Sequence, residues 1–215
     1  MSVPEPTIQI VDDDESFLAA ISRLLRASGF AVTTFSSASE LLAACDADAP
    51  GCVLADLQMP GMNGLDLQAA LARTRNPLPI LFLTGHGDIP SSVRAMREGA
   101  VDFLEKRAPK EHLLDALKRA LARDARDRAE RAHLRELRTR FDTLTARELE
   151  VLSHVVRGQL NKQIAADLAI HERTVKRHRT AVTTKLGVQS VAELTQLSLE
   201  GGIFTALPST VPKGL

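Results

Sequence analysis

The sequence predicts an α/β domain, a (βα)5 doubly wound parallel sheet, followed by an all-α domain. Three observations support this prediction. Up to residue 123, short apolar runs alternate with amphipathic helical patterns; residues 124–140 are rich in Arg and Ala with interspersed acids; residues 141–205 contain helical patterns alone. Alternating strand and helix patterns are typical of a parallel sheet that helices cover on both faces.

The five predicted strands are short, apolar and evenly distributed. They are residues 8–11, 32–35, 52–55, 80–84 and 102–105. The helical patterns between and after them are residues 16–28, 38–44, 64–72, 91–98 and 110–123. The first of these helices carries apolar Phe17, Ile21, Leu24 and Leu25 on one face and is followed by Gly29, a residue favoured just beyond a helix end.

Residues 124–140 are predicted to continue the preceding helix as a solvated linker. A coiled-coil contact is the alternative, but the apolar positions are too sparse for a sustained heptad seam. The predicted division is therefore residues 1–123, a linker at 124–140, a helical domain at 141–205 and a disordered tail at 206–215, which contains two prolines.

Capping signals divide the helical domain. Thr145 and Glu148 form a capping box that opens one helix, and Ser190 and Glu193 form another at the start of the last helix. Between them, Asn161 is expected to cap a short helix over 162–168, and a break at 169–171 precedes a basic helix over 172–186. Two helices joined by a short break, the second one basic, are typical of a helix-turn-helix.

Polar residues gather where the predicted strands end. Asp12 and Asp13 follow the first strand, Asp56 ends the third, Thr84 ends the fourth and Lys106 follows the fifth. In open parallel sheets these ends share one edge, so the five side chains are expected to converge. Three carboxylates repel one another and need a cation, which predicts a hard divalent ion such as Mg²⁺.

This arrangement suits phosphoryl transfer. An ionised carboxylate is already a nucleophile, while a metal ion and a lysine neutralise the phosphoryl oxygens. The alternative for residues 12–15, read alone, is an acidic helix start that is favourable to the helix dipole.

The segments VDDD (11–14), DLQMPGMNG (56–64), LTGHGD (83–88) and GAVDFLEK (99–106) resemble the receiver domain of two-component response regulators, over residues 7–122. The resemblance implies that Asp56 takes a phosphoryl group from a sensor histidine kinase. It also implies that Asp13, Asp56 and the backbone carbonyl of Gln58 hold Mg²⁺, with Asp12 acting through water. Thr84 and Phe103 would form the switch, although Phe103 could equally be a core ring.

One departure from the family concerns the residue after Lys106. The family carries proline there in a cis peptide bond, whereas this chain has Arg107 and places Pro109 two residues later. Because a cis bond to a non-proline residue costs roughly 2.5–4 kcal/mol, we expect a trans bond and a rearranged loop. Pro109 is expected near the start of the following helix.

The basic helix is the candidate for DNA recognition. Its bases are Arg173, Lys176, Arg177, Arg179 and Lys185, against the single acid Glu172. A solvated basic face is the alternative, since charge runs often mean no more. Basic and polar side chains on an exposed helix also suit phosphates and base edges in the major groove.

The segments LTARE (144–148), NKQIA (161–165), TVKRH (174–178) and KLGV (185–188) resemble the LuxR-type helix-turn-helix of the NarL/FixJ subfamily, over residues 142–201. The resemblance implies that Lys176, Arg177 and Thr180 face the groove and that Arg179 and Lys185 contact phosphates. His178 is either a base contact or a packed residue near a dimer surface. His171 stands where the family often has serine as N-cap, and imidazole caps less well.

Together the two resemblances predict a transcription regulator. Phosphorylation would promote a homodimer on a double-stranded DNA operator, through a face carried over from the family at residues 91–98 and 103–104. RNA polymerase is a candidate further partner. Two alternatives stay open: an aspartyl-phosphate phosphohydrolase, which usually has a second Asp at the position of Gln58, and a DNA-binding protein that ignores phosphorylation.

Composition excludes several other classes. Tyr and Trp are absent and Phe numbers 7, which disfavours nucleic-acid sites built on stacked rings. Cys45 and Cys52 lack the spacing of a disulfide framework or zinc site, and Cys52 is expected to be a core residue. No secretory signal and no apolar run of about 20 residues is present, so a cytoplasmic protein without a membrane partner is expected.

Overall fold

The computed structural model describes residues 5–46, 48–74, 77–85 and 89–203. The predicted tail at 206–215 and part of the 83–88 segment lie outside these residues. The chain divides into two compact units, residues 1–129 and 130–215, which are described separately.

The first unit is the predicted five-stranded parallel sheet, in the order β2-β1-β3-β4-β5. The strands are β1 (Thr7–Val11), β2 (Ala31–Phe35), β3 (Gly51–Ala55), β4 (Ile80–Thr84) and β5 (Asp102–Glu105). Each matches its predicted run to within one residue, because buried apolar runs bounded by polar residues and turns mark strands clearly.

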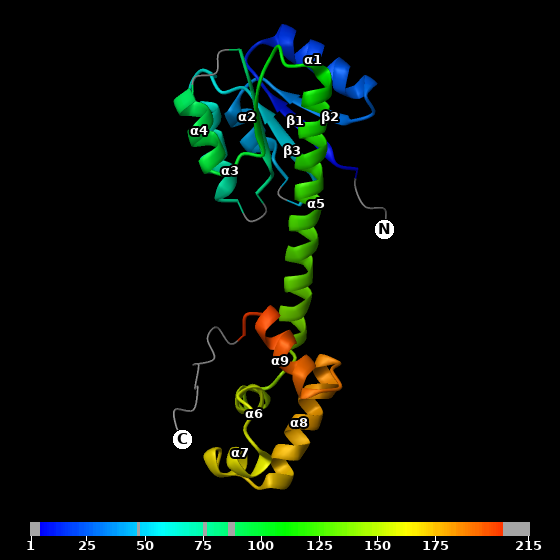
Figure 1. Cartoon of the computed structure of the whole chain (residues 1–215), viewed down its shortest axis with the longest axis vertical. Helices are drawn as coiled ribbons and strands as arrows, with labels where there is room; N and C mark the ends of the chain where they lie inside the picture. Colours follow the sequence, from blue (N-terminus) through cyan, green and yellow to red (C-terminus); the bar gives the residue numbers. More distant parts are fainter. Residues whose placement is uncertain (1–4, 47, 75–76, 86–88, 204–215) are drawn as a thin grey trace, which may run out of the picture. The chain divides into compact units, whose positions relative to one another are not determined.

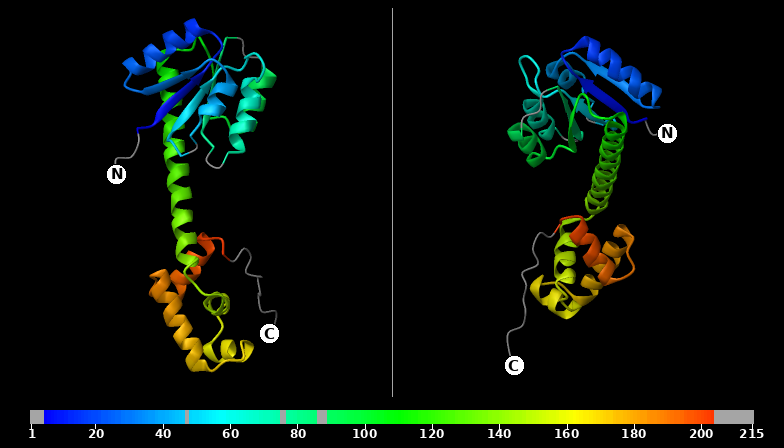
Figure 2. Two further views of the ribbon diagram at one scale, coloured as in Figure 1. Left: turned by 180° about the vertical axis from the view of Figure 1, so that it is seen from behind. Right: turned by 45° about the horizontal axis from the view of Figure 1, so that its top comes forward.

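Helices cover both faces of this sheet, as Figures 1 and 2 show from opposite sides. The five are α1 (Glu15–Ala27), α2 (Ala38–Ala44), α3 (Gly64–Ala72), α4 (Ile89–Arg97) and α5 (Lys110–Phe141). One core joins α1 and α5 to the sheet, and another joins α2, α3 and α4 to the opposite face. The helix α1 begins at Glu15, one residue before the prediction, because Asp14 is its N-cap and accepts the Phe17 N–H at 3.0 Å with its side chain.

Gly64 begins α3 directly behind the end of β3. A Cβ atom at this position would lie 2.4 Å from the backbone oxygen of Asp56 and 2.8 Å from the Phe82 ring. Only glycine therefore lets α3 pack this closely against the residue that follows β3.

The helix α5 is continuous from the first unit into the second, which confirms that residues 124–140 extend the preceding helix. At its start the carbonyl of Pro109 accepts the His112 N–H at 3.0 Å, so this proline stands at the helix N-terminus as expected. Near its end, Leu137 and Phe141 are buried in the core of the second unit.

The second unit contains α6 (Ala146–Val156), α7 (Asn161–Asp167), α8 (Glu172–Leu186) and α9 (Val191–Glu200) around one apolar core. These helices are seen in the second view of Figure 2. The capping box predicted for α6 is confirmed, since Thr145 accepts the Glu148 N–H and Glu148 accepts the Thr145 N–H. At α9 only half of the predicted box is present: Ser190 accepts the Glu193 N–H, but the Glu193 carboxylate accepts the N–H of Gln189 at 2.9 Å instead of that of Ser190.

The predicted cap at Asn161 is wrong by one residue. Leu160 is the N-cap of α7, and its N–H donates to the side chain of Gln163 at 2.8 Å. The Asn161 side chain instead accepts a hydrogen bond from Arg179 on α8, so a tertiary contact takes the oxygen that capping would have used.

Among the helices that the structure describes, none is long and apolar enough to cross a membrane.

Candidate metal centre and nucleic-acid interface

The predicted acidic residues meet at the carboxyl end of the sheet. Asp12, Asp13 and Asp56 each place a carboxylate oxygen within 4.8 Å of the others. The parallel register pairs Val11 with Ala55, so the residues that follow β1 and β3 emerge side by side. Asp12 and Asp56 are buried and Asp13 is exposed, which leaves one side of the cluster open. Such a set of oxygen ligands fits a hard divalent cation like Mg²⁺.

Lys106 points into this cluster. Its Nζ lies 2.6 Å from Oδ2 of Asp12 and 3.2 Å from Oδ2 of Asp56. Burial lowers the pKa of Lys106, but its hydrogen bond with Asp12 and the negative charges of Asp56 and Asp12 outweigh burial and raise the pKa. Burial raises the pKa of Asp12, partly offset by the hydrogen bonds from Lys106 and from the Asp14 N–H.

The loop after Lys106 does not divert this side chain. Among the described residues no peptide bond is cis, so the expected trans bond at Lys106-Arg107 is confirmed. The Lys106 N–H donates to the carbonyl of Thr84 at 2.8 Å, which ties the lysine to the end of β4. Arg107 turns outward to Glu105, with 2.5 Å between Nε and Oε2. The rearrangement that we expected therefore leaves the lysine at the carboxylates.

The two predicted switch residues lie on neighbouring strands. Thr84 is buried at the end of β4, and Phe103 on β5 is half-buried. The Phe103 ring packs against Phe82 with 6.0 Å between centroids. The same ring lines a surface cavity of about 600 Å³ along α4. Phe103 thus touches both the core and the surface.

Phe17 lies beside the acidic cluster, although its helical periodicity predicted only that it packs into the core. Its ring centroid lies 4.3 Å from Nζ of Lys106, a cation–π distance. A signal was present: the ring follows the capping residue Asp14 by three positions, so the first turn of α1 carries it beside the acidic pair. Gln58, whose carbonyl was predicted to bind the metal, lies on the exposed loop after β3.

In the second unit, α8 presents the predicted DNA contacts. Lys176, Arg177 and Thr180 are exposed, and Lys176 forms a 3.6 Å ion pair with Glu172 on its own helix. The opposite face is buried by Val175, Val182 and Leu186. His171 is the N-cap of α8 and makes no capping hydrogen bond with its side chain, as its chemistry suggested.

Both residues predicted to contact phosphates have hydrogen-bond partners inside the domain. Arg179 donates to Oδ1 of Asn161 at 2.7 Å and so holds α8 to the start of α7. Lys185 donates to Oε2 of Glu148 at 2.7 Å and to the carbonyl of Thr143 at 3.0 Å. His178 is half-buried.

Comparison with known protein families shows which family this chain belongs to. Residues 8–118 match the response regulator receiver domain, and residues 142–198 match the bacterial regulatory proteins of the luxR family. The chain belongs to the NarL/FixJ subfamily of response regulators.

Relatives within this subfamily align over nearly the whole chain. The response regulator protein TodT of Pseudomonas putida is 42% identical over 92% of this chain and 87% of its own. The transcriptional regulatory protein FixJ of Rhizobium meliloti is 39% identical over 91% of this chain and 96% of its own. The solved structure of the response regulator StyR has a TM-score of 0.82 at 43% identity, covering 91% of this chain and 99% of that one.

As a NarL/FixJ response regulator, the chain is a transcription factor and not an enzyme of the phosphohydrolase type. It combines a receiver domain, with its phosphoacceptor aspartate site, and a LuxR-type DNA-binding domain. The acidic cluster of Asp12, Asp13 and Asp56 is typical of the receiver Mg²⁺ site.

Proposed function

We propose that Asp56 accepts a phosphoryl group from a sensor histidine kinase and that this step controls dimerisation and operator binding. The observation that carries the proposal is the placement of Lys106 between the buried carboxylates of Asp12 and Asp56. A cation held at this point can neutralise phosphoryl oxygens as they arrive at the carboxylate.

Of the three carboxylates, Asp56 fits the acceptor role best. Asp12 already receives the shorter bond from Lys106 and a second from the Asp14 N–H, so it is committed to holding the site together. Asp13 is exposed and lies at the open side, where it suits a metal ligand. Asp56 has one oxygen anchored by the Leu57 N–H at 2.7 Å and the other facing Lys106.

We assign Mg²⁺ to Asp12, Asp13, Asp56 and the carbonyl of Gln58, with Asp12 acting through water. Bound there, the ion would neutralise charge on the phosphoryl group during transfer. Lys106 would hold another phosphoryl oxygen, and the Thr84 hydroxyl would donate to the acyl phosphate once it has formed.

The dimerisation step would use α4 and β5. Ile89, Val93 and Met96 are exposed on α4 at 79%, 44% and 46%, an unusual amount of apolar surface for a solvated helix. They line one cavity together with Phe103. Movement of Phe103 toward Thr84 would reshape this face and favour a second copy of the chain on it.

For operator binding, we assign the base contacts to Lys176, Arg177 and Thr180, with His178 beside them. Arg179 and Lys185 would reach phosphates only by sharing the bonds that they make to Asn161 and Glu148. We therefore expect these two cations to contribute less to the DNA affinity than Lys176 and Arg177 do. The proposed partners are the kinase, the operator, a second copy and RNA polymerase, in the bacterial cytoplasm where the operator lies.

The test is phosphorylation in vitro. The wild-type chain is incubated with Mg²⁺ and a small-molecule phosphodonor, and intact mass is compared with that of Asp56→Asn. We expect wild type to gain one phosphoryl group and Asp56→Asn to gain none. Asp13→Asn should still fold but label slowly. Equal labelling of wild type and Asp56→Asn would place the acceptor elsewhere.

A second measurement separates the phospho-switch from a regulator that ignores phosphorylation. Sedimentation and operator binding are compared with and without the phosphodonor. We expect both dimer content and affinity to rise in wild type and to stay constant in Asp56→Asn. If the labelled chain stays monomeric at concentrations that saturate the operator, the dimerisation part is wrong.

A further inference from the structure

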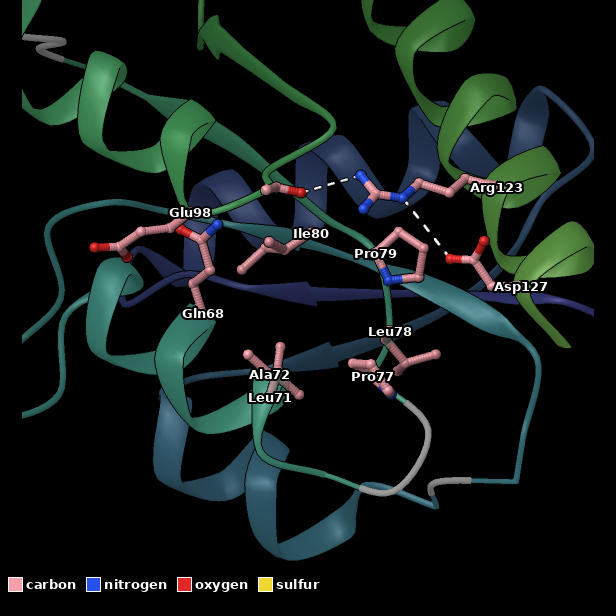
Figure 3. Close-up of a pocket in the computed structure, with 11 residues that line it drawn as sticks. Gln68, Leu71, Ala72, Pro77, Leu78, Pro79, Ile80, Glu98, Arg123 and Asp127 are labelled. Carbon is pink, nitrogen blue, oxygen red and sulfur yellow. Dashed lines mark hydrogen bonds and ion pairs between the residues drawn. The ribbon is translucent and has the colours of Figure 1, made fainter. Parts of the chain in front are cut away.

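Arginine side chains of α5 donate to main-chain carbonyls of other elements in both units. In the first unit, Arg123 donates to the carbonyl of Gly99 at 3.1 Å, which is one of the dashed lines in Figure 3. In the second unit, Arg140 in the last turn of α5 donates from Nη2 to the carbonyl of Leu186. Leu186 is the last residue of α8, so Arg140 joins the end of α5 to the helix that carries the proposed base contacts.

The carbonyl of Leu186 is a favourable place for a cation. The helix α8 ends at Gly187, which has a left-handed φ of 66°, and the N–H of Val188 turns back to the carbonyl of Thr183 at 3.0 Å. The last carbonyls of a helix lie beyond the reach of its own N–H groups and carry the negative end of the helix dipole. The guanidinium of Arg140 therefore supplies both a donor and a compensating charge.

The backbone on the α5 side of this contact is held by the core. Leu137 and Phe141, which flank Arg140 on α5, are 1% and 2% exposed in the apolar core of the second unit. Arg140 itself is half-buried, and a Cβ atom at Gly187 would lie only 3.0 Å from its Nη2. The guanidinium thus approaches the end of α8 closely from a turn that is anchored by packing.

A second hydrogen bond joins the same two helix ends in the opposite direction. Lys185, the neighbour of Leu186, donates from Nζ to the carbonyl of Thr143 at 3.0 Å. Thr143 follows the end of α5, and its N–H donates to the carbonyl of Arg140 at 3.2 Å. Two bonds at different points restrict the angle between two helices, whereas a single bond would leave rotation about that bond free.

The proposed base contacts lie well away from this link, near the other end of α8. Lys176 stands ten positions before Leu186, which is about 15 Å along a helix. Between them, Arg179 holds α8 to Asn161 at 2.7 Å. A tilt of α8 about this middle contact would displace the base contacts, and hydrogen bonds to base edges tolerate little displacement.

We propose that Arg140 is a positioning residue for operator recognition. By holding the carbonyl of Leu186 it sets the tilt of α8, and with it the placement of Lys176 and Arg177 on the base edges. The inference rests on the proposed DNA binding and goes beyond it, because Arg140 acts through α8 and not through a contact of its own with DNA. A movement of the last turn of α5 would then move the recognition helix with it.

The test measures how well the full chain distinguishes two DNA duplexes. One duplex is selected by the wild-type chain from a random-sequence pool, and the other is a shuffled duplex of the same composition. The specificity ratio is the Kd for the shuffled duplex divided by the Kd for the selected one. Arg140→Met keeps an unbranched stem but loses the donors, and it should lower the ratio about five- to tenfold, the lower end of what one base contact supplies.

Three further variants separate positioning from charge and from stability. Arg140→Lys restores a donor and the positive charge, so it should recover most of the ratio. Arg138→Met removes a cation from an exposed position of the same helix and should leave the ratio unchanged. Leu194→Val trims the buried core from α9 and should lower the melting temperature, but it keeps the Arg140 contact and should also leave the ratio unchanged.

An unchanged ratio in Arg140→Met would overturn the inference, as would an equal fall in Arg140→Lys, Arg138→Met or Leu194→Val. A wild-type ratio near 1 would instead overturn the proposed operator binding, and this inference with it. If Arg140→Met fails to fold, nitrogen NMR of the wild-type chain decides. Slowly exchanging Nη protons of Arg140 are expected, and rapid exchange with free rotation would show that the guanidinium does not hold Leu186.

Discussion

Lys185 on α8 donates a hydrogen bond to Glu148 on α6, with 2.7 Å between Nζ and Oε2. The same carboxylate accepts the Thr145 N–H at 2.7 Å and completes the capping box of α6. Glu148 thus caps the N-terminus of α6 and also holds the C-terminal end of α8 against it. The hydrogen bond from Lys185, followed by the Thr145 N–H, lowers the pKa of Glu148.

Glu148→Gln should lower the stability of the second unit by about 1–2 kcal/mol, through loss of the charged bond and a weaker cap. Because the folded pKa is depressed, the stabilisation is present above the ordinary glutamate pKa and is lost as pH falls through the depressed value. Unfolding of wild type and Glu148→Gln is compared between neutral and acid pH. A difference that stays constant into acid would contradict this account.

Phe17→Leu should slow phosphorylation by a small phosphodonor about two- to fivefold. The variant keeps an apolar side chain but removes the ring 4.3 Å from Lys106, a contact worth about 0.5–1 kcal/mol. Initial rates are followed by intact mass. Phe30→Leu, in the same apolar core, is the control and should leave the rate unchanged.

Asp124→Ala should destabilise the first unit by about 2–4 kcal/mol. Asp124 is 2% exposed, accepts the Gly51 N–H at 2.9 Å, and pairs with Arg128 at 2.7 Å. Its loss removes the acceptor of the buried Gly51 N–H and the carboxylate that faces Arg128, while Arg128 keeps its hydrogen bonds to the carbonyls of Asp48 and Ala49. Hydrogen exchange of the peptide that contains β3 measures this destabilisation. Asp124→Asn keeps an acceptor and should therefore lose less stability than Asp124→Ala. Equal exchange in wild type and Asp124→Ala would contradict the prediction.

Cys52 should resist alkylation in the native chain. Burial, with the nearby charge of Asp124, raises the pKa of its thiol to about 12, so almost no thiolate exists near neutral pH. Cys45 is only partly buried and should react at least about tenfold faster. Peptide mapping after iodoacetamide treatment at mildly alkaline pH measures both, and in urea the two rates should converge. Equal rates in the folded chain would show that β3 opens readily.

Local patterns were sufficient for the sheet and for the convergence of the acidic residues. Strand periodicity and length are encoded within a few neighbouring residues, and parallel strands bring their carboxyl ends to one edge whatever the details of packing. Hence the sequence alone predicts that Asp12, Asp56 and Lys106 lie together. The motif resemblance then supplied the expected roles, which sheet geometry alone does not distinguish.

The sequence-based predictions were wrong or incomplete for side chains that can contact either a neighbour in sequence or a residue far along the chain. Asn161 was a reasonable helix cap, but Arg179 lies eighteen positions away in sequence and takes its oxygen. Phe17 had the periodicity of a core residue, yet the fold brings Lys106 over its ring. Neither contact can be predicted from the residues that are neighbours in sequence.

By itself, the sequence determined the succession of strands and helices along the chain, the sheet edge at which the carboxylates gather, and the basic helix of the second unit. Each of these follows from short-range periodicity and chain direction. Tertiary structure decided that Lys106 reaches Asp12 and Asp56 despite the Arg107 loop, and that Lys185 is held by Glu148. Those outcomes depend on which charged groups packing brings within a few ångströms, and that is a property of the folded chain as a whole.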